Sequence, residues 1–309
     1  MGELMSKYII KRLLEVIPVL FIITFAVFIL VYHAGDPVSM MLPEDASQED
    51  RENLRESLGL NEPFLVQYGS FIKDISTGNF GVSTRYNAEA LPLVLERLPA
   101  TFELAGAAML VSLIISIPLG IWSANKRNSF VDLFITGGSV LGKAMPNFWL
   151  GIMLILVLAV MIPIFPVSGR GTMLHLILPA ITLGTSVAAE MTRLVRSSML
   201  DTLGQDYIRT AMSKGVSDKK VIFYHAFRNT LIPVLTITTL QLSILVSGSI
   251  ITESVFQWPG LGMLLVQAVN ARDMAVVQAA VFIIAIFVIL VNLITDLIYV
   301  IIDPRIKYS

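Results

Sequence analysis

Six stretches of this chain are long and apolar enough to cross a lipid bilayer. A helix needs roughly 20 apolar residues to span about 30 Å of hydrocarbon, and lipid offers the backbone no hydrogen bonds, so a spanning segment must satisfy its own. The sequence therefore predicts an all-α polytopic membrane protein with six transmembrane helices. They are expected at about Tyr8 to Tyr32, Thr101 to Ala124, Leu133 to Ile162 with Pro146 inside, His175 to Val195, Leu231 to Thr252, and Val276 to Ile302.

The composition agrees with a lipid-embedded protein and argues against several other classes. Of the 309 residues, 55% are hydrophobic and 15% are charged, whereas soluble domains average about 25% charged residues. A net charge of −1 provides no basic face for nucleic acid. The chain has no cysteine, and His33, His175 and His225 are too far apart in sequence to form a helical metal pair. No metal site is therefore predicted.

The distribution of Lys and Arg predicts which side of the membrane each loop faces. Basic residues gather before the first apolar stretch, between the second and third, between the fourth and fifth, and after the sixth, while the short loops on the other side hold only Arg170 and Arg272. Because cytoplasmic loops carry the excess of basic residues, both termini are predicted to be cytoplasmic. The predicted domains are residues 1–32 with the first helix, an extracytoplasmic segment at 33–99, and a five-helix core at 100–309.

The extracytoplasmic segment is predicted to be a small cap of mixed helix and irregular structure. Ser47 is placed to cap a helix, with Asp50 as an acidic residue in its first turn. The run from Gly78 to Gly81 predicts a turn. The segment holds too few apolar residues for a large core of its own.

A charged segment at 198–230 separates the fourth and fifth apolar stretches. Its sequence predicts a helix from Gln205 to Ser213, and Gly215 is placed to end that helix with a positive φ. Ser217 is placed to cap a second short helix. The expected product is a compact amphipathic element near the cytoplasmic membrane surface. From the pattern alone, a solvated connector explains this segment equally well.

The order of several motifs adds to this prediction. The charged segment contains Asp206-Tyr207-Ile208-Arg209-Thr210-Ala211, then Lys214-Gly215 and His225-Ala226-Phe227-Arg228-Asn229. Other motifs are Leu98-Pro99-Ala100-Thr101, Met145-Pro146-Asn147-Phe148-Trp149, Trp258-Pro259-Gly260-Leu261-Gly262 and Asp303-Pro304-Arg305-Ile306. In this order, over nearly the whole chain, they resemble ABC-transporter permeases of the dipeptide, oligopeptide and nickel import branch. One departure is Arg209-Thr210-Ala211, where the broader family has Glu-Ala-Ala.

The resemblance implies a permease that is not itself an enzyme. The chain lacks the G-x-x-x-x-G-K-[ST] loop of nucleotide-binding proteins, and in this family ATP and Mg are held by separate subunits. The implied partners are a second homologous permease, two cytoplasmic ATPase subunits, an extracytoplasmic solute-binding protein and the lipid bilayer of a bacterial or archaeal cytoplasmic membrane. Peptides are the expected solute, with nickel, a metal chelate or glutathione as the alternative. An ATP-independent secondary transporter is less favoured, because no paired inverted halves are evident.

The same resemblance implies that the charged segment couples the permease to the ATPases. The residues expected to do so are Tyr207, Ala211, Gly215, Val216, Ser217 and Asp218. Their alternative role is to hold the shape of the loop.

Residues within the predicted spans suggest part of a solute pathway. Thr236, Thr239, Ser243 and Ser247 recur at steps of three and four, so they share one helix face that serves either passage or helix packing. Lys143 is expected near mid-bilayer, where it either lines the passage or pairs with Glu190 or Asp296. Glu253 is expected near the outer boundary within reach of water, in an outer gate or a docking site for the binding protein.

Overall fold

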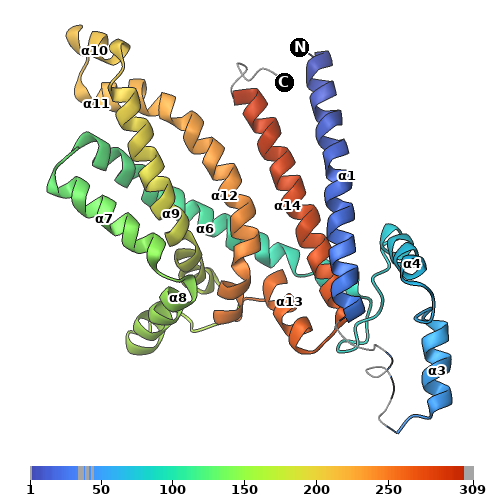
Figure 1. The fold of residues 1–309 in the computed structure, drawn as a ribbon. Helices are drawn as coiled ribbons and strands as arrows, with labels where there is room; N and C mark the ends of the chain where they lie inside the picture. The colour runs from blue at the N-terminus through green and yellow to red at the C-terminus, as the bar shows by residue number, and fades with distance from the viewer. Residues whose placement is uncertain (1, 34–37, 39–41, 43–44, 303–309) are drawn as a thin grey trace. The chain divides into compact units, whose positions relative to one another are not determined.

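The computed structural model describes residues 2–33, 38, 42 and 45–302, except for the side chains of 2–13, 30–31, 33, 247–248 and 296–302. Figure 1 shows a chain made of helices. In the described residues, strand-type pairing is limited to one isolated bridge between Val82 and Glu89. The predicted all-α fold class is therefore confirmed.

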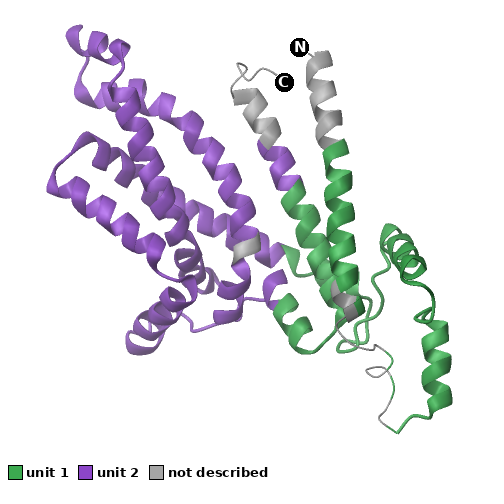
Figure 2. Cartoon of the chain, in the orientation of Figure 1, with its two compact units in different colours: residues 1–98, 264–289 green, residues 99–263, 290–309 purple. Residues whose placement is uncertain are grey.

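The chain folds into two compact units, residues 1–98 with 264–289 and residues 99–263 with 290–309 (Figure 2). The first unit holds α1 (Gly2–His33), α3 (Gln48–Ser57), α4 (Phe64–Ser76) and α5 (Ala90–Leu95). The second holds α6 (Leu98–Asn125), α7 (Phe130–Ala144), α8 (Asn147–Ile155), the π-helix η1 (Leu156–Met161) and α9 (Met173–Leu203), followed by α10 (Asp206–Ser213), α11 (Asp218–Lys220), the π-helix η2 (Val221–Ala226) and α12 (Phe227–Val255). Both units include parts of α13 (Leu261–Asn270) and α14 (Met274–Ile302).

Four helical segments among the described residues are long and apolar enough to cross a membrane. They are 90–125, 173–203, 218–246 and 274–295, and they cover the second, fourth, fifth and sixth predicted spans. A fifth candidate consists of two helical segments with a bend between them, α7 and the continuous helix of α8 and η1, if the two count as one span. The described apolar part of α1, Leu14–Ile29, is shorter. The count of six transmembrane helices stays a prediction.

The third predicted span is not one straight helix. Its two halves are bent by 99° at the break between Ala144 and Asn147. Met145 has an extended conformation, with φ −71° and ψ 126°. Pro146 explains this break, because the proline ring disfavours helical backbone at the residue before it and proline has no N–H to continue the hydrogen bonds. The prediction placed Pro146 inside this span and did not include the bend.

Helix α9 is the centre of the second unit and packs against α7, α8 and α12. Two glycines allow it to approach α6 closely. A Cβ on Gly120 would lie 2.6 Å from the Cβ of Val195, and one on Gly184 would lie 2.6 Å from the carbonyl oxygen of Ala108. Small residues let membrane helices approach to backbone distance, so these two positions fix where α6 and α9 cross.

The segment after α1 has the predicted cap and turn. Ser47 caps α3, and its Oγ accepts a hydrogen bond from the Asp50 N–H at 3.1 Å. Gly78 and Gly81 both have positive φ, 79° and 85°, as the predicted turn requires. The turn is anchored within the first unit by Asp273, whose buried carboxylate accepts a hydrogen bond from Ser83 Oγ.

Candidate functional site

The charged segment between α9 and α12 folds as the sequence predicts up to Gly215. The helix α10 runs from Asp206 to Ser213, and Gly215 follows with φ 77°. The Gly215 N–H donates to the carbonyl of Met212 at 2.9 Å, and the Val216 N–H donates to the carbonyl of Ala211 at 3.2 Å. These two bonds close the end of the helix in the way that a left-handed glycine allows. Ala211, Gly215 and Val216 thus form the turn itself.

The second half of the segment differs from its prediction. Ser217 stands at the N-cap position with φ −62° and ψ 146°, and Asp218 begins α11. The helix is not short, because its backbone continues through the π-helix η2 into α12. The sequence has no glycine or proline from Asp218 to Ile232, so this stretch contains neither of the residues that most strongly break a helix. One continuous helix therefore joins the turn to the span.

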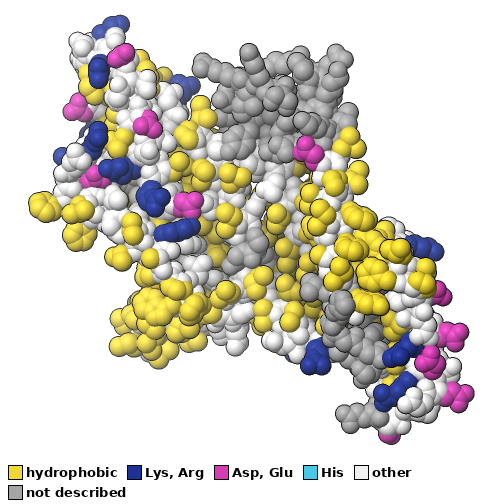
Figure 3. Space-filling view, in the orientation of Figure 1, with side chains coloured by type: hydrophobic (Ala, Val, Ile, Leu, Met, Phe, Trp, Pro, Cys, Tyr) yellow, Lys and Arg dark blue, Asp and Glu magenta, His cyan; other side chains and the backbone are white. Residues whose placement is uncertain are grey.

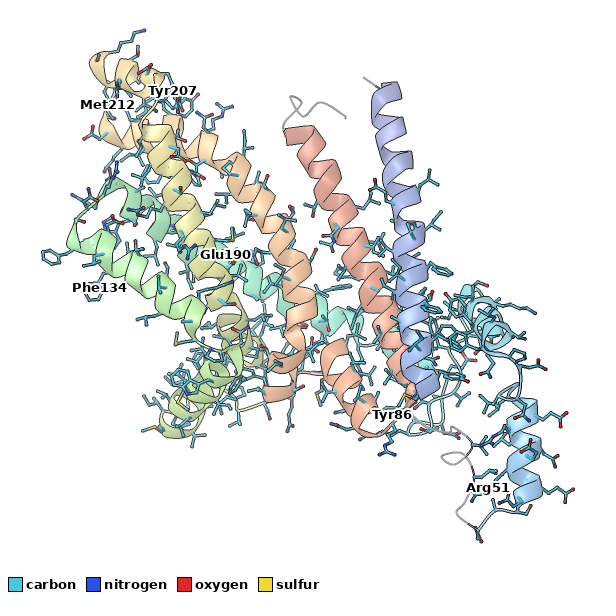
Figure 4. All side chains as sticks on the ribbon, in the orientation of Figure 1. Arg51, Tyr86, Phe134, Glu190, Tyr207 and Met212 are labelled. Atoms are coloured by element: carbon cyan, nitrogen blue, oxygen red, sulfur yellow. The ribbon has the colours of Figure 1, made fainter. Side chains whose placement is uncertain are left out.

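The segment presents exposed aromatic and apolar side chains over a buried base. Met212 on α10 and Phe223 and Tyr224 on η2 are exposed, whereas Ile208 and Val221 are fully buried. Tyr207 is also exposed, and its hydroxyl accepts a hydrogen bond from Asn229 Nδ2 at 2.6 Å. Figure 4 shows Tyr207 and Met212 on α10. This hydrogen bond ties α10 to α12. The exposed surface of α10 carries Tyr207 and Met212 beside the charged Asp206 and Arg209.

A buried ion pair lies within the second unit between α7 and α9, and sequence reasoning missed it. Arg196 donates to both carboxylate oxygens of Asp132, with Nε and Nη2 at 2.7 and 2.8 Å. Ser123 Oγ and the Asn128 N–H donate to the same carboxylate at 2.5 and 2.9 Å. The pair joins the C-terminal end of α6 and the N-terminal end of α7 to α9. In the sequence it precedes the turn at Gly215. Its signal in the sequence was a single Asp in the first turn of a long apolar stretch.

Lys143 forms the pair that was one of its two predicted roles. Its Nζ lies 2.7 Å from Glu190 Oε2, which joins the last turn of α7 to α9. Both side chains are about half exposed, so this pair lies at a surface of the second unit. The side chain of Asp296, the other predicted partner, lies outside the described residues. A role of Lys143 in the passage stays a prediction.

The hydroxyl face of α12 takes part in helix packing at one position. Ser243 is buried, and its Oγ donates to Asn292 Oδ1 on α14 at 3.1 Å. Thr239 Oγ1 donates to the carbonyl of Thr236 at 2.8 Å, and both threonines are half-buried. The side chain of Ser247 lies outside the described residues. The packing alternative thus has a contact at Ser243, and the passage alternative stays a prediction.

Glu253 was expected within reach of water, and this expectation is wrong. Its side chain is 0% exposed. One carboxylate oxygen accepts hydrogen bonds from Thr101 Oγ1 and Ser249 Oγ, both at 2.9 Å, and the other accepts from the Met263 N–H at 3.0 Å. A Cβ on Gly260 would overlap the carboxylate. Glycine at that position therefore lets the loop after α12 fold over the acid and exclude water.

The same loop is fastened to the start of α6. Trp258 is buried, and its Nε1–H donates to the carbonyl of Ala100 at 2.8 Å. The Leu261 N–H donates to Thr101 Oγ1 at 2.8 Å. Arg170 lies over the Trp258 ring at 5.7 Å and pairs with Glu103 of α6 at 2.6 Å. The motif from Trp258 to Gly262 thus holds α6, α12 and α13 together at one end.

Two solved structures share this fold with the chain. One is described as inward-facing conformations of the MetNI methionine ABC transporter, with a TM-score of 0.58 and 18% identity over 68% of this chain and 96% of that chain. The other is an amino acid ABC transporter with histidines, with a TM-score of 0.53 and 15% identity over 67% of this chain and 93% of that one. The chain therefore shares its fold with chains of these two ABC transporters.

The family is shown by sequence. The chain belongs to the binding-protein-dependent transport system inner membrane components, whose family model matches residues 116–308, and the model for the N-terminal region of such components matches residues 5–105. The oligopeptide transport system permease protein AppB of Bacillus subtilis is 43% identical over 98% of this chain and all of its own length. The dipeptide permease DppB and the glutathione permease GsiC of Escherichia coli K12 are each 39% identical over 99% of this chain and all of theirs. The chain is thus a multi-pass transport permease.

Proposed function

We propose that this protein is the membrane-spanning subunit of an ATP-driven importer of peptides. The observation that carries the proposal is the charged segment from Asp206 to Asn229, which exposes aromatic and apolar side chains on a turn fixed at Gly215. A contact with a partner that moves explains this exposure, and the family to which the chain belongs supplies that expectation.

The coupling surface comprises Tyr207, Ala211, Gly215, Val216, Ser217 and Asp218. Two cytoplasmic ATPase subunits bind ATP and Mg and press on this surface, while the chain itself hydrolyses nothing. A second, homologous permease completes the passage. An extracytoplasmic solute-binding protein delivers the solute, and ATP binding and hydrolysis drive the exchange between outward and inward openings.

The orientation and the domain division follow from the distribution of charge. The chain lies in a bacterial or archaeal cytoplasmic membrane with both termini in the cytoplasm, because its basic groups gather on that side. Residues 33–99 form the extracytoplasmic segment, and residues 100–309 form the core with its coupling loop at 198–230.

The passage uses one face of α12, with Thr236, Thr239, Ser243 and Ser247, and Lys143 on α7. Hydroxyl groups suit a peptide backbone, which both donates and accepts hydrogen bonds. Lys143 suits the carboxylate at the end of a peptide, once it releases Glu190. Glu253 contributes from a distance, because its hydrogen bonds hold the loop that closes one end of α12.

Peptides are the solute class that the relatives support, since AppB and DppB are named for oligopeptide and dipeptide transport. Glutathione, for which GsiC is named, is itself a tripeptide and belongs to the same class.

The proposal is tested by purifying the chain with the proteins that associate with it and rebuilding the complex in sealed vesicles. Uptake of labelled dipeptides and oligopeptides is measured with ATP, without ATP, and with a non-hydrolysable analogue. We expect uptake only with ATP and only with the binding protein present. Uptake at the full rate by the chain alone, without a nucleotide-hydrolysing subunit, would contradict the proposal.

A further inference from the structure

The helix α4 lies against α1 through one aromatic face. Phe64, Tyr68 and Phe71 are spaced by four and three residues, so they share a side of the helix. The Phe28 ring of α1 lies 5.2 to 5.3 Å from each of these three rings. Tyr68 is buried, and its hydroxyl lies 3.1 Å from Thr24 Oγ1. This polar contact fixes the position of α4 along α1.

The contact places α4 within the apolar length of α1. The helix α1 has 32 residues, or about 48 Å at 1.5 Å per residue, which is enough to cross a bilayer. In the sequence the apolar run of α1 continues to Tyr32, and Thr24 lies eight residues before that point, or about 12 Å along the helix. The Tyr68 contact therefore lies beside the apolar length of α1.

The side of α4 away from α1 is apolar at the start of the helix and charged near its end. Leu65 is 76% exposed and Val66 is 49% exposed. Lys73 and Asp74 are exposed in the last turn. The preceding helix differs, because α3, whose ten residues are all described, has no buried residue and carries charges throughout. Figure 3 shows hydrophobic side chains over α1 and α4, whereas Asp and Glu gather over α3.

The helix α1 that α4 packs against also exposes apolar side chains. Leu14, Ile17, Phe21 and Ile22 of α1 are each more than half exposed, as side chains that face lipid are. The Phe21 ring lies 5.8 Å from the buried ring of Tyr68, so exposed Phe21 borders the face through which α4 packs on α1. Exposure of Leu65 and Val66 to water would cost free energy, whereas exposure of the same side chains to lipid would not.

We propose that α4 is an interfacial membrane helix, with Leu65 and Val66 in the acyl chains and Lys73 directed to lipid phosphates. An ammonium on a flexible stem reaches the headgroups while its methylenes stay in an apolar environment. The inference requires α1 to span the bilayer, as the proposed function does. It requires neither ATP coupling nor a particular side of the membrane.

The absence of cysteine from the chain makes the test direct. Single variants Leu65→Cys, Val66→Cys, Leu58→Cys and Ile22→Cys receive a nitroxide label in the assembled complex, in vesicles of phosphatidylethanolamine and phosphatidylglycerol. Collision with oxygen, which concentrates in lipid, is compared with collision with a water-soluble nickel chelate. We expect labels at 65 and 66 to favour oxygen. The matched control is Leu58, a 44% exposed leucine at the end of α3, where the label should favour the nickel chelate.

Ile22 separates failure of this inference from failure of the proposed function. A label at 22 in lipid, with labels at 65 and 66 as open to the nickel chelate as the label at 58, would overturn the role of α4 alone. A label at 22 in water would show that α1 does not span, and both proposals would fall. Labels at 65 and 66 shielded from both reagents would show that protein covers α4, and this outcome also overturns the inference.

Discussion

Replacement of Arg196 by Gln should destabilise the protein strongly, because it leaves the Asp132 carboxylate without its cation. The Asp132 side chain is 7% exposed and the Arg196 side chain is 28% exposed. Removal of one partner from a buried ion pair costs about 3 to 5 kcal/mol. Asp132 retains hydrogen bonds from Ser123 and Asn128, and Arg196 is in part open. We therefore expect a loss at or below the lower limit of this range, about 2 to 3 kcal/mol.

The assay is reversible unfolding of the purified protein in mixed detergent and denaturant micelles, for the single variants Arg196→Gln and Asp132→Asn and for the double variant. The second replacement should cost far less in the presence of the first, because the unpaired charge is then gone. Lys143→Gln is the matched control. Its pair with Glu190 is about half exposed, and such pairs contribute about 0 to 1 kcal/mol. Equal effects of Arg196→Gln and Lys143→Gln, or strict additivity in the double variant, would refute the reasoning.

Three further predictions concern the turn at Gly215, the solute passage and the loop that folds over Glu253. Gly215→Pro should abolish uptake while the complex still assembles, because proline cannot adopt φ 77°; normal solute-stimulated ATPase activity in this variant would count against the coupling role. Lys143→Ala should reduce the rate of uptake if the residue lines the passage, and uptake kinetics identical to those of the natural protein at equal expression would favour packing alone. Gly260→Ala should destabilise the protein by about 1 to 3 kcal/mol, because the added Cβ overlaps the Glu253 carboxylate; Gly106→Ala, where the added atom meets open space, is its control, and equal unfolding of the two variants would show that the loop gives way freely.

Local signals in the sequence were sufficient for most of the helices. Apolar runs placed α6, α9, α12 and α14, and the glycine at 215 and the serine at 47 marked their turn and cap, because each depends on the residue itself and its near neighbours. The break at Pro146 was also a local signal. It was outweighed by the apolar composition on both sides, which fits a straight span as well as a bent one.

The contacts between distant residues could not be predicted in this way. Thr101 and Glu253 are 152 positions apart, and only the fold brings the hydroxyl to the acid. An acid near the end of an apolar stretch is ordinarily expected to face water, so its complete burial required knowledge of the three donors around it. The pairing of Asp132 with Arg196 was hidden for the same reason, and the short helix α13 was missed because its ten residues cannot span a membrane.

The continuous helix from Asp218 to Val255 has a mechanical consequence. It holds 38 residues, or about 57 Å at 1.5 Å per residue. The turn at Gly215 adjoins one end of this rod, and Glu253 sits at the other. A displacement of the end at Asp218 would therefore be transmitted to the end at Val255. The helix has two sites at which it can bend instead, the wider π-turn of η2 and the kink that Pro233 permits. The stiffness of the helix in those two places would decide how much of a movement at Gly215 reaches Glu253.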